Sequence, residues 1–322
     1  MALVEWTPNG LYCPGGDFYI DPIKKVAKAV ITHAHSDHAR KGCQAYLTSN
    51  TGASLLRHRL GKKINVQTCA EGESLSIGQV RVSLHSAGHM LGSCQIRIEN
   101  RGEVWVVSGD YKRQADPTCT PFEVIRCHTF ITESTFALPI FHWPAVALVM
   151  EEIHRWWRCN QEHRIASVLF AYSLGKAQRL QALLDPTIGP IVVHPNIHAI
   201  NAAYEKLQDH FAEVGLLNTE NVPQQLESGL LIVPPGTAIP SALENRTICS
   251  YGIVSGWMRG LMRSHRQGRG FVLSDHADWH DIMQTIKETG AQSVGVMHGY
   301  VGPLVHYLNE QGLNAWAVQS FM

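Results

Sequence analysis

The chain lacks several features that would assign it to a protein class at once. No apolar run among its 322 residues reaches the length of a membrane-spanning helix. Its eight cysteines never form a C-x-x-C pair, and no signal peptide precedes them, so we expect reduced thiols and a cytoplasmic protein. The formal net charge is zero with histidine neutral, so any site for a polyanion must be local.

The sequence also has no internal repeat, heptad pattern or low-complexity segment. Hydrophobic residues make up 45% of the chain and charged residues 17%, which is typical of a globular protein that is not bound to a membrane. Histidine is abundant, with 18 residues, and this favours metal or proton chemistry without establishing either.

Short apolar runs alternate with helical patterns, as in an α/β protein. Several runs predict strands that lead almost at once into a residue able to do chemistry. These runs are 28–32, 80–85, 104–108, 129–132, 271–274 and 293–297, and the residues are His33, His89, Asp110, Glu133, His276 and His298. Because sites in α/β sheets lie outside the carboxyl ends of strands, we expect these side chains to meet at one edge.

The middle of the chain predicts a second βα series without ligand-type residues at its strand ends. The helical patterns are 144–158, 174–184 and 197–213, and the strand patterns are 165–171, 190–193 and 230–233. We interpret this series as an insertion that closes over the site like a cap.

Four residues with metal-binding side chains, His33, His35, Asp37 and His38, stand within six positions after an apolar run. Three imidazoles and a carboxylate in this space would repel if protonated and lose solvation if buried, and a bound metal removes both problems. His33 and His35 alternate by two and share a side of an extended segment. One ion can therefore take His33 and His35, and a second can take Asp37 and His38.

Each ion needs a further nitrogen ligand, and a carboxylate should bridge them. The stretch SAGHMLGS supplies His89, VVSGDY supplies Asp110 and VMHGY supplies His298. Imidazole and carboxylate ligands suit zinc, manganese or iron about equally.

The H-x-H-x-D-H motif, followed by the later His, Asp and His in order, resembles the metallo-β-lactamase superfamily. Four short stretches are similar to the β-CASP nucleases of that superfamily: GHMLGS (88–93), TEST (132–135), SDHADW (274–279) and HG (298–299). SDHADW and two further stretches most resemble the bacterial ligase-associated DNA exonucleases: LYCPGGDFYIDP (11–22) and SGWMRG (255–260). The resemblance spans nearly the whole chain and is weakest at about 140–250.

The resemblance implies an α/β fold, with a four-layer αββα metallo-β-lactamase sandwich and an inserted α/β β-CASP cap. The sandwich would comprise 1–139 and 271–322 and carry the two-metal site, and the cap would comprise 140–270. By the same resemblance the residues divide into two ligand sets: His33, His35 and His89 on one ion, Asp37, His38 and His298 on the other, and Asp110 bridging. Glu133 matches the acidic residue of the cap motifs, and His276 the histidine that it orients. The two divalent ions would be zinc or manganese.

The function expected from these residues is hydrolysis of a phosphodiester in single-stranded nucleic acid, by two-metal activation of a bridging hydroxide. The catalytic residues would be Asp37, Asp110, Glu133 and His276, with His276 giving a proton to the leaving sugar oxygen. The resemblance favours a DNA exonuclease in repair that is functionally associated with an ATP-dependent DNA ligase and a helicase.

Two other functions stay open. His298 as the last ligand is the pattern of the RNA-cutting branch, which favours an RNA-processing enzyme of the same fold. A small-molecule ester or thioester hydrolase would have a nearly identical two-ion site. The sequence does not decide between exonuclease and endonuclease action.

Several polar residues outside the metal motifs are candidates for substrate binding. Ser173 and Lys176 stand where a helix N-terminus could bind phosphate, although an ordinary helix start has the same pattern. Arg259, Arg263 and Arg266 could follow a nucleic-acid backbone or lie in a solvated loop.

Overall fold

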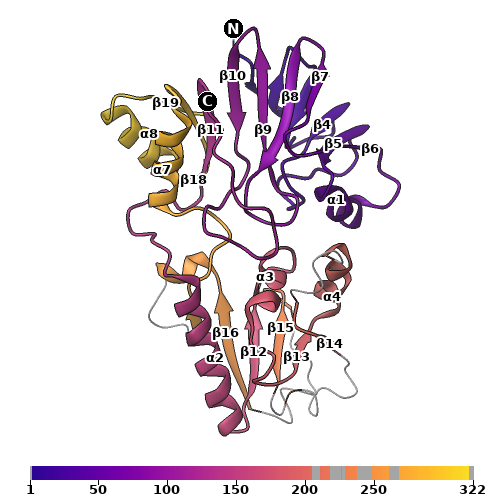
Figure 1. Cartoon of the computed structure of the whole chain (residues 1–322), viewed down its shortest axis with the longest axis vertical. Helices are drawn as coiled ribbons and strands as arrows, with labels where there is room; N and C mark the ends of the chain where they lie inside the picture. The colour runs from indigo at the N-terminus through magenta and orange to yellow at the C-terminus, as the bar shows by residue number, and fades with distance from the viewer. Residues whose placement is uncertain are drawn as a thin grey trace. The chain divides into compact units, whose positions relative to one another are not determined.

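The computed structural model describes residues 2–204, 211–217, 226, 229–237, 248–260 and 268–318. The chain is a mixed α/β protein with several sheets, and it divides into two compact units. Residues 1–139 and 276–322 form the first unit, and residues 140–275 form the second. Each unit has its own sheets and its own core (Figure 1).

The first unit begins with a sheet built from the N-terminal segment. Its strands are β1 (Glu5–Thr7), β2 (Gly10–Cys13), β3 (Phe18–Ile20), β4 (Lys28–Val30), β5 (Ala45–Ser49) and β6 (Val66–Cys69). They lie in sequence order, antiparallel from β1 to β3 and parallel from β3 to β6. Helix α1 (Gly52–Leu60) connects β5 to β6.

A second sheet of the first unit combines segments that are far apart in the sequence. Its strands are β7 (Ser74–Ile77), β8 (Val80–Ser86), β9 (Cys94–Asn100), β10 (Glu103–Val107), β11 (Thr129–Ser134), β18 (Ser293–Gly299) and β19 (Asn314–Ala317). The order is β19-β18-β11-β10-β9-β8-β7. Helices α7 (Trp279–Thr289) and α8 (Val301–Glu310) belong to the same C-terminal segment as β18 and β19.

Apolar residues from both sheets form one shared cluster in the first unit. On β8, Val80, Val82 and Leu84 alternate with polar residues, so every second side chain enters this cluster. Val30 of β4 and Leu47 of β5 join it from the first sheet. Burial of each large aliphatic side chain contributes about 1.5–3 kcal/mol, so the alternation fixes which face of β8 points inward.

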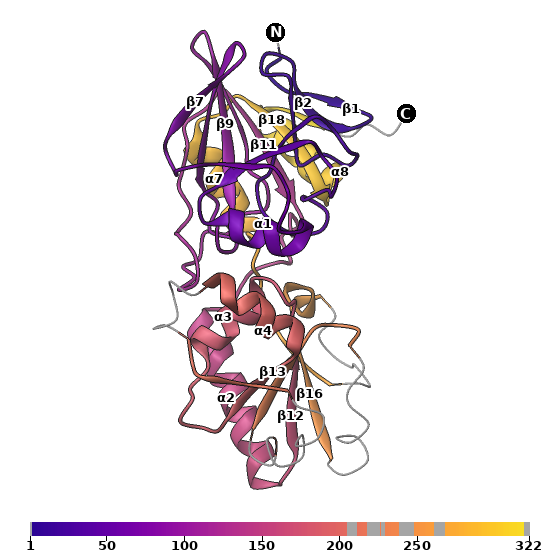
Figure 2. The same ribbon diagram turned by 90° about the vertical axis from the view of Figure 1, so that its right-hand side faces the viewer.

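Helices cover the other faces of these two sheets (Figure 2). Leu56 of α1 lies in a cluster with Tyr46 of β5. Ile286 of α7 and Leu304 of α8 lie in a cluster with Val296 of β18. The loops at the ends of the strands are therefore attached to a core that is packed from both sides.

The second unit has a parallel sheet with helices on it. Its strands are β12 (Ala166–Phe170), β13 (Ile191–Val193), β14 (Val214–Leu216), β15 (Leu230–Val233), β16 (Cys249–Val254) and β17 (Arg269–Phe271), in the order β14-β13-β15-β12-β16-β17. Its helices are α2 (Val146–Glu162), α3 (Lys176–Leu183), α4 (Pro195–Asn201) and the 3-10 helix η2 (Gly256–Arg259). Trp157 and Ile153 of α2 are fully buried against this sheet.

Strands form over most of the runs that the sequence predicts, with one clear difference. The run 271–274 was expected to be a strand, but β17 ends at Phe271. The chain turns directly afterwards, since the amide of Leu273 donates to the carbonyl of Phe271. Of the helix expected over 197–213, α4 accounts for the first part, and 205–210 lie outside the described residues.

Within the part of the chain that the structure describes, no helix is both long enough and apolar enough to cross a membrane.

Candidate metal centre

Glycines shape the loops that carry the candidate ligands. Gly109 has a φ of 56°, and a Cβ atom at this position would lie 2.7 Å from the Cβ atom of Thr32. Only glycine lets the chain after β10 pass so close to the chain after β4, and the next residue is Asp110. In the β8–β9 loop, the amides of His89 and Met90 both donate to the Ser93 hydroxyl at 3.1 Å, which fixes the backbone of His89.

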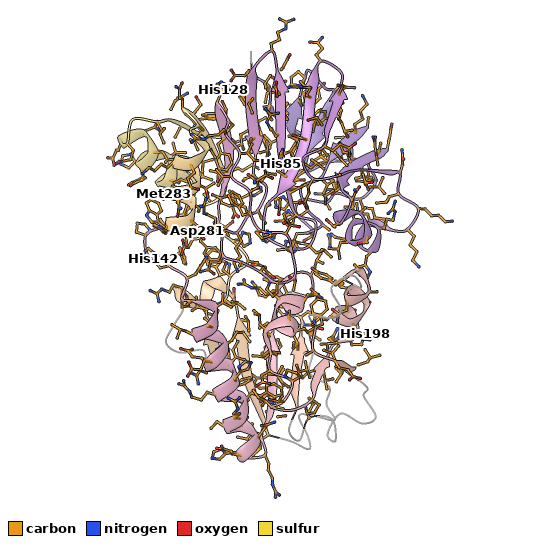
Figure 3. The ribbon with its side chains drawn as sticks, in the orientation of Figure 1. His85, His128, His142, His198, Asp281 and Met283 are labelled. Atoms are coloured by element: carbon orange, nitrogen blue, oxygen red, sulfur yellow. The ribbon has the colours of Figure 1, made fainter. Side chains whose placement is uncertain are left out.

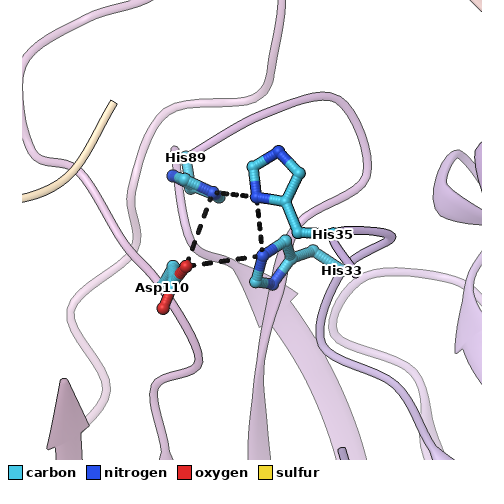
Figure 4. Close-up of side chains that lie close together, drawn as sticks. All are labelled: His33, His35, His89 and Asp110. Carbon is cyan, nitrogen blue, oxygen red and sulfur yellow. Dashed lines mark hydrogen bonds and ion pairs between the residues drawn. The ribbon is translucent and has the colours of Figure 1, made fainter. Parts of the chain in front are cut away.

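Four side chains from three loops converge on one point (Figure 4). His35 Nδ1 lies 3.1 Å from His33 Nε2 and 3.1 Å from His89 Nε2. Asp110 Oδ2 lies 3.5 Å from His33 Nε2 and 3.8 Å from His89 Nε2. The expectation that these loops meet at one edge of the sheets therefore agrees with their positions.

The spacing of these donors fits a divalent ion. A tetrahedral ion with bonds of about 2.1 Å holds its donors about 3.4 Å apart. Four of the donor pairs here are 3.1–3.8 Å apart, and all four donor atoms lie within 4.8 Å of one another. Burial, followed by the neighbouring His38, lowers the pKa of His33 well below its ordinary value. A neutral imidazole is the form that binds a metal.

A second set of donors lies on the other side of Asp110. His38 Nε2 is 3.4 Å from Asp110 Oδ1 and 3.7 Å from Asp37 Oδ2. The ring centroids of His38 and His298 are 5.3 Å apart. The two carboxylate oxygens of Asp110 thus face different sets of side chains, which is the arrangement that a bridging carboxylate requires.

His298 owes its position to a bulge between β11 and β18. Glu133 pairs with Met297 and Ser134 pairs with Gly299, so the register steps over His298. Its φ of 55° is rare for a residue other than glycine. Bulges re-aim side chains next to active sites. Glu133 and His298 were expected after their strands, but both lie inside them because pairing continues to Ser134 and Gly299.

Asp21 was not identified from the sequence, and its carboxylate contacts the candidate ligand His38 on the ring nitrogen that faces away from Asp110. Asp21 Oδ2 lies 2.7 Å from His38 Nδ1, and Asp21 Oδ1 accepts from the Thr32 amide at 2.8 Å. The Thr32 hydroxyl lies 3.1 Å from His33 Nδ1. A carboxylate in this position fixes the ring orientation and tautomer of a ligand histidine. The signal that could have found it is its place directly after β3, the same rule that found the other residues.

Charge within the site is balanced by these contacts. Burial alone would lower the pKa of His38, but Asp110 and Asp21 together raise it well above its ordinary value. Burial alone would raise the pKa of Asp110, but His38 and His276 lower it well below its ordinary value. Without a metal, the buried carboxylate of Asp110 is therefore ionised and compensated by an imidazolium.

A buried carboxylate orients His276 toward the same point. Glu133 Oε2 lies 2.8 Å from His276 Nδ1, and Glu133 Oε1 accepts from the Tyr111 amide at 2.8 Å. The other ring nitrogen, His276 Nε2, is 3.9 Å from Asp110 Oδ2. The amide of Ala277 donates to the carbonyl of Tyr111 at 2.7 Å, which holds the His276 loop against the Asp110 loop.

The described candidates for substrate binding, Ser173, Lys176 and Arg259, lie in the second unit. Lys176 is buried, and its ammonium group is 3.0 Å from Asp275 Oδ1. The carbonyl of Ser173 accepts from the Gln178 side chain at 3.0 Å. Arg259 is exposed at the end of η2. Arg263 and Arg266 lie outside the described residues, and all five assignments stay predictions.

Several curated proteins are similar in sequence to this chain. A "Probable DNA ligase" from Opitutus terrae is 29% identical over 96% of this chain and 30% of its own length. "Endoribonuclease YSH1" from Mycosarcoma maydis is 30% identical over 39% of this chain and 14% of its own length, and that from Gibberella zeae is 30% identical over 44% and 18%. The chain thus spans less than a third of the length of these relatives. No family model matches the sequence.

A solved structure shares the fold. The crystal structure of a protein of unknown function from Enterococcus faecalis has a TM-score of 0.58, with 11% identity over 84% of this chain and 75% of the other. At this identity the likeness concerns the fold alone.

Proposed function

We propose that the chain is a metal-dependent phosphodiesterase that shortens single-stranded DNA from an end during repair. The convergence of three imidazoles and one carboxylate on a single point carries the proposal. Similarity to endoribonucleases and, over nearly the whole chain, to a probable DNA ligase supports a nucleic-acid substrate. The same similarity to a ligase supports a functional link to strand joining.

The fold that we propose is the metallo-β-lactamase sandwich with an inserted β-CASP cap. In the first unit, α1, the two sheets, and α7 with α8 would be its four layers, and their shared and outer clusters support this reading. The second unit, at 140–275, would be the cap. The similarity to the endoribonucleases supports the same family.

Two divalent ions, zinc or manganese, would occupy the site. The first would be held by His33, His35 and His89, and the second by Asp37, His38 and His298, with Asp110 between them. When bound, they supply positive charge that lowers the pKa of water and offsets the charge of the phosphodiester.

The chain's own residues position that charge and move the protons. Asp110 offers one oxygen to each ligand set, and Asp21 fixes the His38 ring through Nδ1. Glu133 accepts from His276 Nδ1 and so turns Nε2 toward the site. His276 Nε2 donates a proton to the leaving sugar oxygen, which would otherwise depart as an unstable alkoxide.

RNA is the second candidate substrate. The similarity to endoribonucleases favours RNA, but the matches to the two endoribonucleases cover only 39% and 44% of this chain. The match to the probable DNA ligase covers 96%. Single strands of DNA and RNA with the same sequence therefore belong in one assay.

The test is hydrolysis of both end-labelled strands by the full chain with manganese or zinc. We expect DNA to be cut faster, with mononucleotides released from the start of the reaction. Asp110→Ala should lower the rate by several orders of magnitude, because Asp110 serves both ligand sets. The matched control is Asp17→Ala, which removes a carboxylate that is exposed on the surface.

Three results would reject parts of the proposal. A folded Asp110→Ala variant with near-normal activity would reject the site. A ladder of long fragments at early times would replace exonuclease with endonuclease action. No hydrolysis of either strand by wild type with its metals bound would reject the nuclease function itself.

A further inference from the structure

The net charge of the whole chain is zero, but one segment of it is strongly basic. Residues 24–63 contain nine Lys or Arg residues and one acidic residue, Asp37, whereas the whole chain contains 27 of each sign. This segment therefore carries a formal net charge of +8, and the remainder of the chain carries −8. An asymmetry of this size creates a local field that the total charge does not reveal.

Eight of the nine cations are exposed on the first unit, on segments that share one buried cluster, and we call these eight residues the basic face. Its residues are Lys24, Lys25, Arg40, Lys41, Arg57, Arg59, Lys62 and Lys63. Among the residues that the structure describes, none of the eight side chains forms an ion pair, whereas the ninth cation, Lys28, pairs with Asp17. The charges of the basic face are therefore available to a partner.

Packing brings the three segments of the basic face together. Val26, Ala39, Cys43 and Leu60 lie in one buried cluster, so the segment before β4, the loop after the metal motif and α1 share a core. The side chain of Lys25 lies over Gly42, where an added Cβ atom would be 2.9 Å from Lys25 Cε.

Part of the basic face lies next to an exposed candidate ligand. Asp37 is the exposed candidate ligand, with 66% of its side chain accessible. Arg59 lies near enough to Asp37 to interact with its charge. Arg40 and Lys41 stand two and three residues after His38, and the hydroxyl of Tyr46 holds this loop by donating to the carbonyl of Arg40 at 2.8 Å.

A structural role does not account for all of this charge. Arg57 and Arg59 lie in the last turn of α1, where cations stabilise the helix dipole. Lys24, Lys25 and Lys41 lie outside the helix, and this effect does not reach them. Unpaired cations clustered beside one another repel, so their arrangement is explained by an anionic partner.

We infer that the basic face binds the phosphate backbone of a single-stranded nucleic acid whose scissile bond lies at the metal centre. This inference rests on the proposed function and names the surface that holds the strand. Exposed cations without ion pairs among the described residues, on segments next to an exposed candidate ligand, match the phosphates that flank a cleaved one. Binding through phosphates predicts little dependence on base sequence.

The test measures binding of a phosphorothioate DNA strand, which resists hydrolysis, to the metal-loaded full chain over a range of salt concentrations. Two independent triple variants each remove three charges: Arg57→Gln with Arg59→Gln and Lys62→Gln, and Lys24→Gln with Lys25→Gln and Lys41→Gln. The control triple removes three exposed cations elsewhere on the first unit: Arg101→Gln, Arg126→Gln and Lys287→Gln.

Each basic-face triple should reduce the salt slope, log Kd against log salt concentration, by about 2, since each lost phosphate contact on a single strand is worth about 0.7. At about 0.15 M salt this corresponds to roughly 50-fold weaker binding. The control triple should bind like wild type. Circular dichroism checks that every variant is folded.

The outcomes separate this inference from the proposed function. Wild type that cuts an unmodified strand, while both basic-face triples bind with wild-type affinity and salt slope, would refute the basic face alone. Wild type that neither binds nor cuts a strand would refute the function. Phosphatidylserine vesicles that bind through the same residues, with no strand binding, would assign the basic face to a membrane surface instead.

Discussion

Asp281 lies in the first turn of α7 (Figure 3). One oxygen of its carboxylate, Oδ2, is buried and lacks a hydrogen bond among the described residues. Burial, followed by the nearby Asp278, raises the pKa of Asp281 to about 6, against an ordinary 3.8. Arg113 and His280 act in the opposite direction, but Arg113 is already paired with Glu288 at 2.7 Å.

The sign of the effect on stability follows from these two pKa values. In the unfolded chain Asp281 ionises near 3.8, and in the folded chain near 6. Stability from this group is therefore lost as the pH rises from about 4 to 6, and the ionised carboxylate, partly screened by solvent, then destabilises the folded state by about 1–2 kcal/mol. Asp281→Asn keeps the shape and removes the charge. We expect it to stabilise the protein by about 1–2 kcal/mol above pH 7.

The assay is urea unfolding of wild type and Asp281→Asn from pH 4 to pH 8. The difference in unfolding free energy should be small near pH 4 and should grow to its full value above pH 6. Glu99→Gln is a control of opposite sign, because hydrogen bonds from Arg97 and Arg81 lower the pKa of Glu99. A constant difference across the pH range, or a destabilised Asp281→Asn variant at pH 8, would refute the reasoning.

Two further predictions concern the site. Asp21→Asn should weaken metal binding by about 10–100-fold, because the His38 ring loses its carboxylate partner. Calorimetric titration with manganese or zinc measures this affinity. An unchanged affinity would show that Asp21 does not support the site. His276→Ala should lower turnover of an oligonucleotide by about 10²–10⁴-fold, and by less on a nitrophenyl phosphodiester, whose leaving group needs no proton. Equal losses on both substrates, or a loss of bound metal, would make His276 a ligand or a structural group.

The sequence predicted most of the strand positions near the site because those strands are buried and apolar. β8, β10 and β11 lie inside a sheet, and the alternation of apolar and polar residues in β8 and the apolar stretches of β10 and β11 identify them without tertiary information. Side chains that follow such strands meet at one edge by geometry. The H-x-H-x-D-H motif is likewise local, so its residues were certain to be neighbours in any fold.

Features that depend on contacts between distant segments were not predictable in the same way. The bulge at His298 exists because β18 pairs with β11, about 160 residues earlier, and nothing in the VMHGY stretch indicates a register step. The length of β17 depends on its pairing with β16. Asp21 could have been found, since it follows β3 directly, but a short strand with mixed burial gives a weak signal.

The zero net charge predicts that any polyanion surface must be local, and the reason is physical. A charge acts over about a Debye length, roughly 8–10 Å near physiological salt, and not over the whole molecule. The relevant quantity is the charge within that distance of the site. The segment 24–63, which carries the metal motif, has nine Lys or Arg residues against one acidic residue, whereas the carboxylates of Asp21, Asp110 and Glu133 are engaged within the site itself. Arg259, Arg263 and Arg266 are the arginines predicted to bind substrate, whereas the segment 24–63 carries nine Lys or Arg residues and contains four of the candidate ligands. For a chain whose total charge is zero, the density of charged residues near the candidate site is therefore a better guide to the substrate than the total charge.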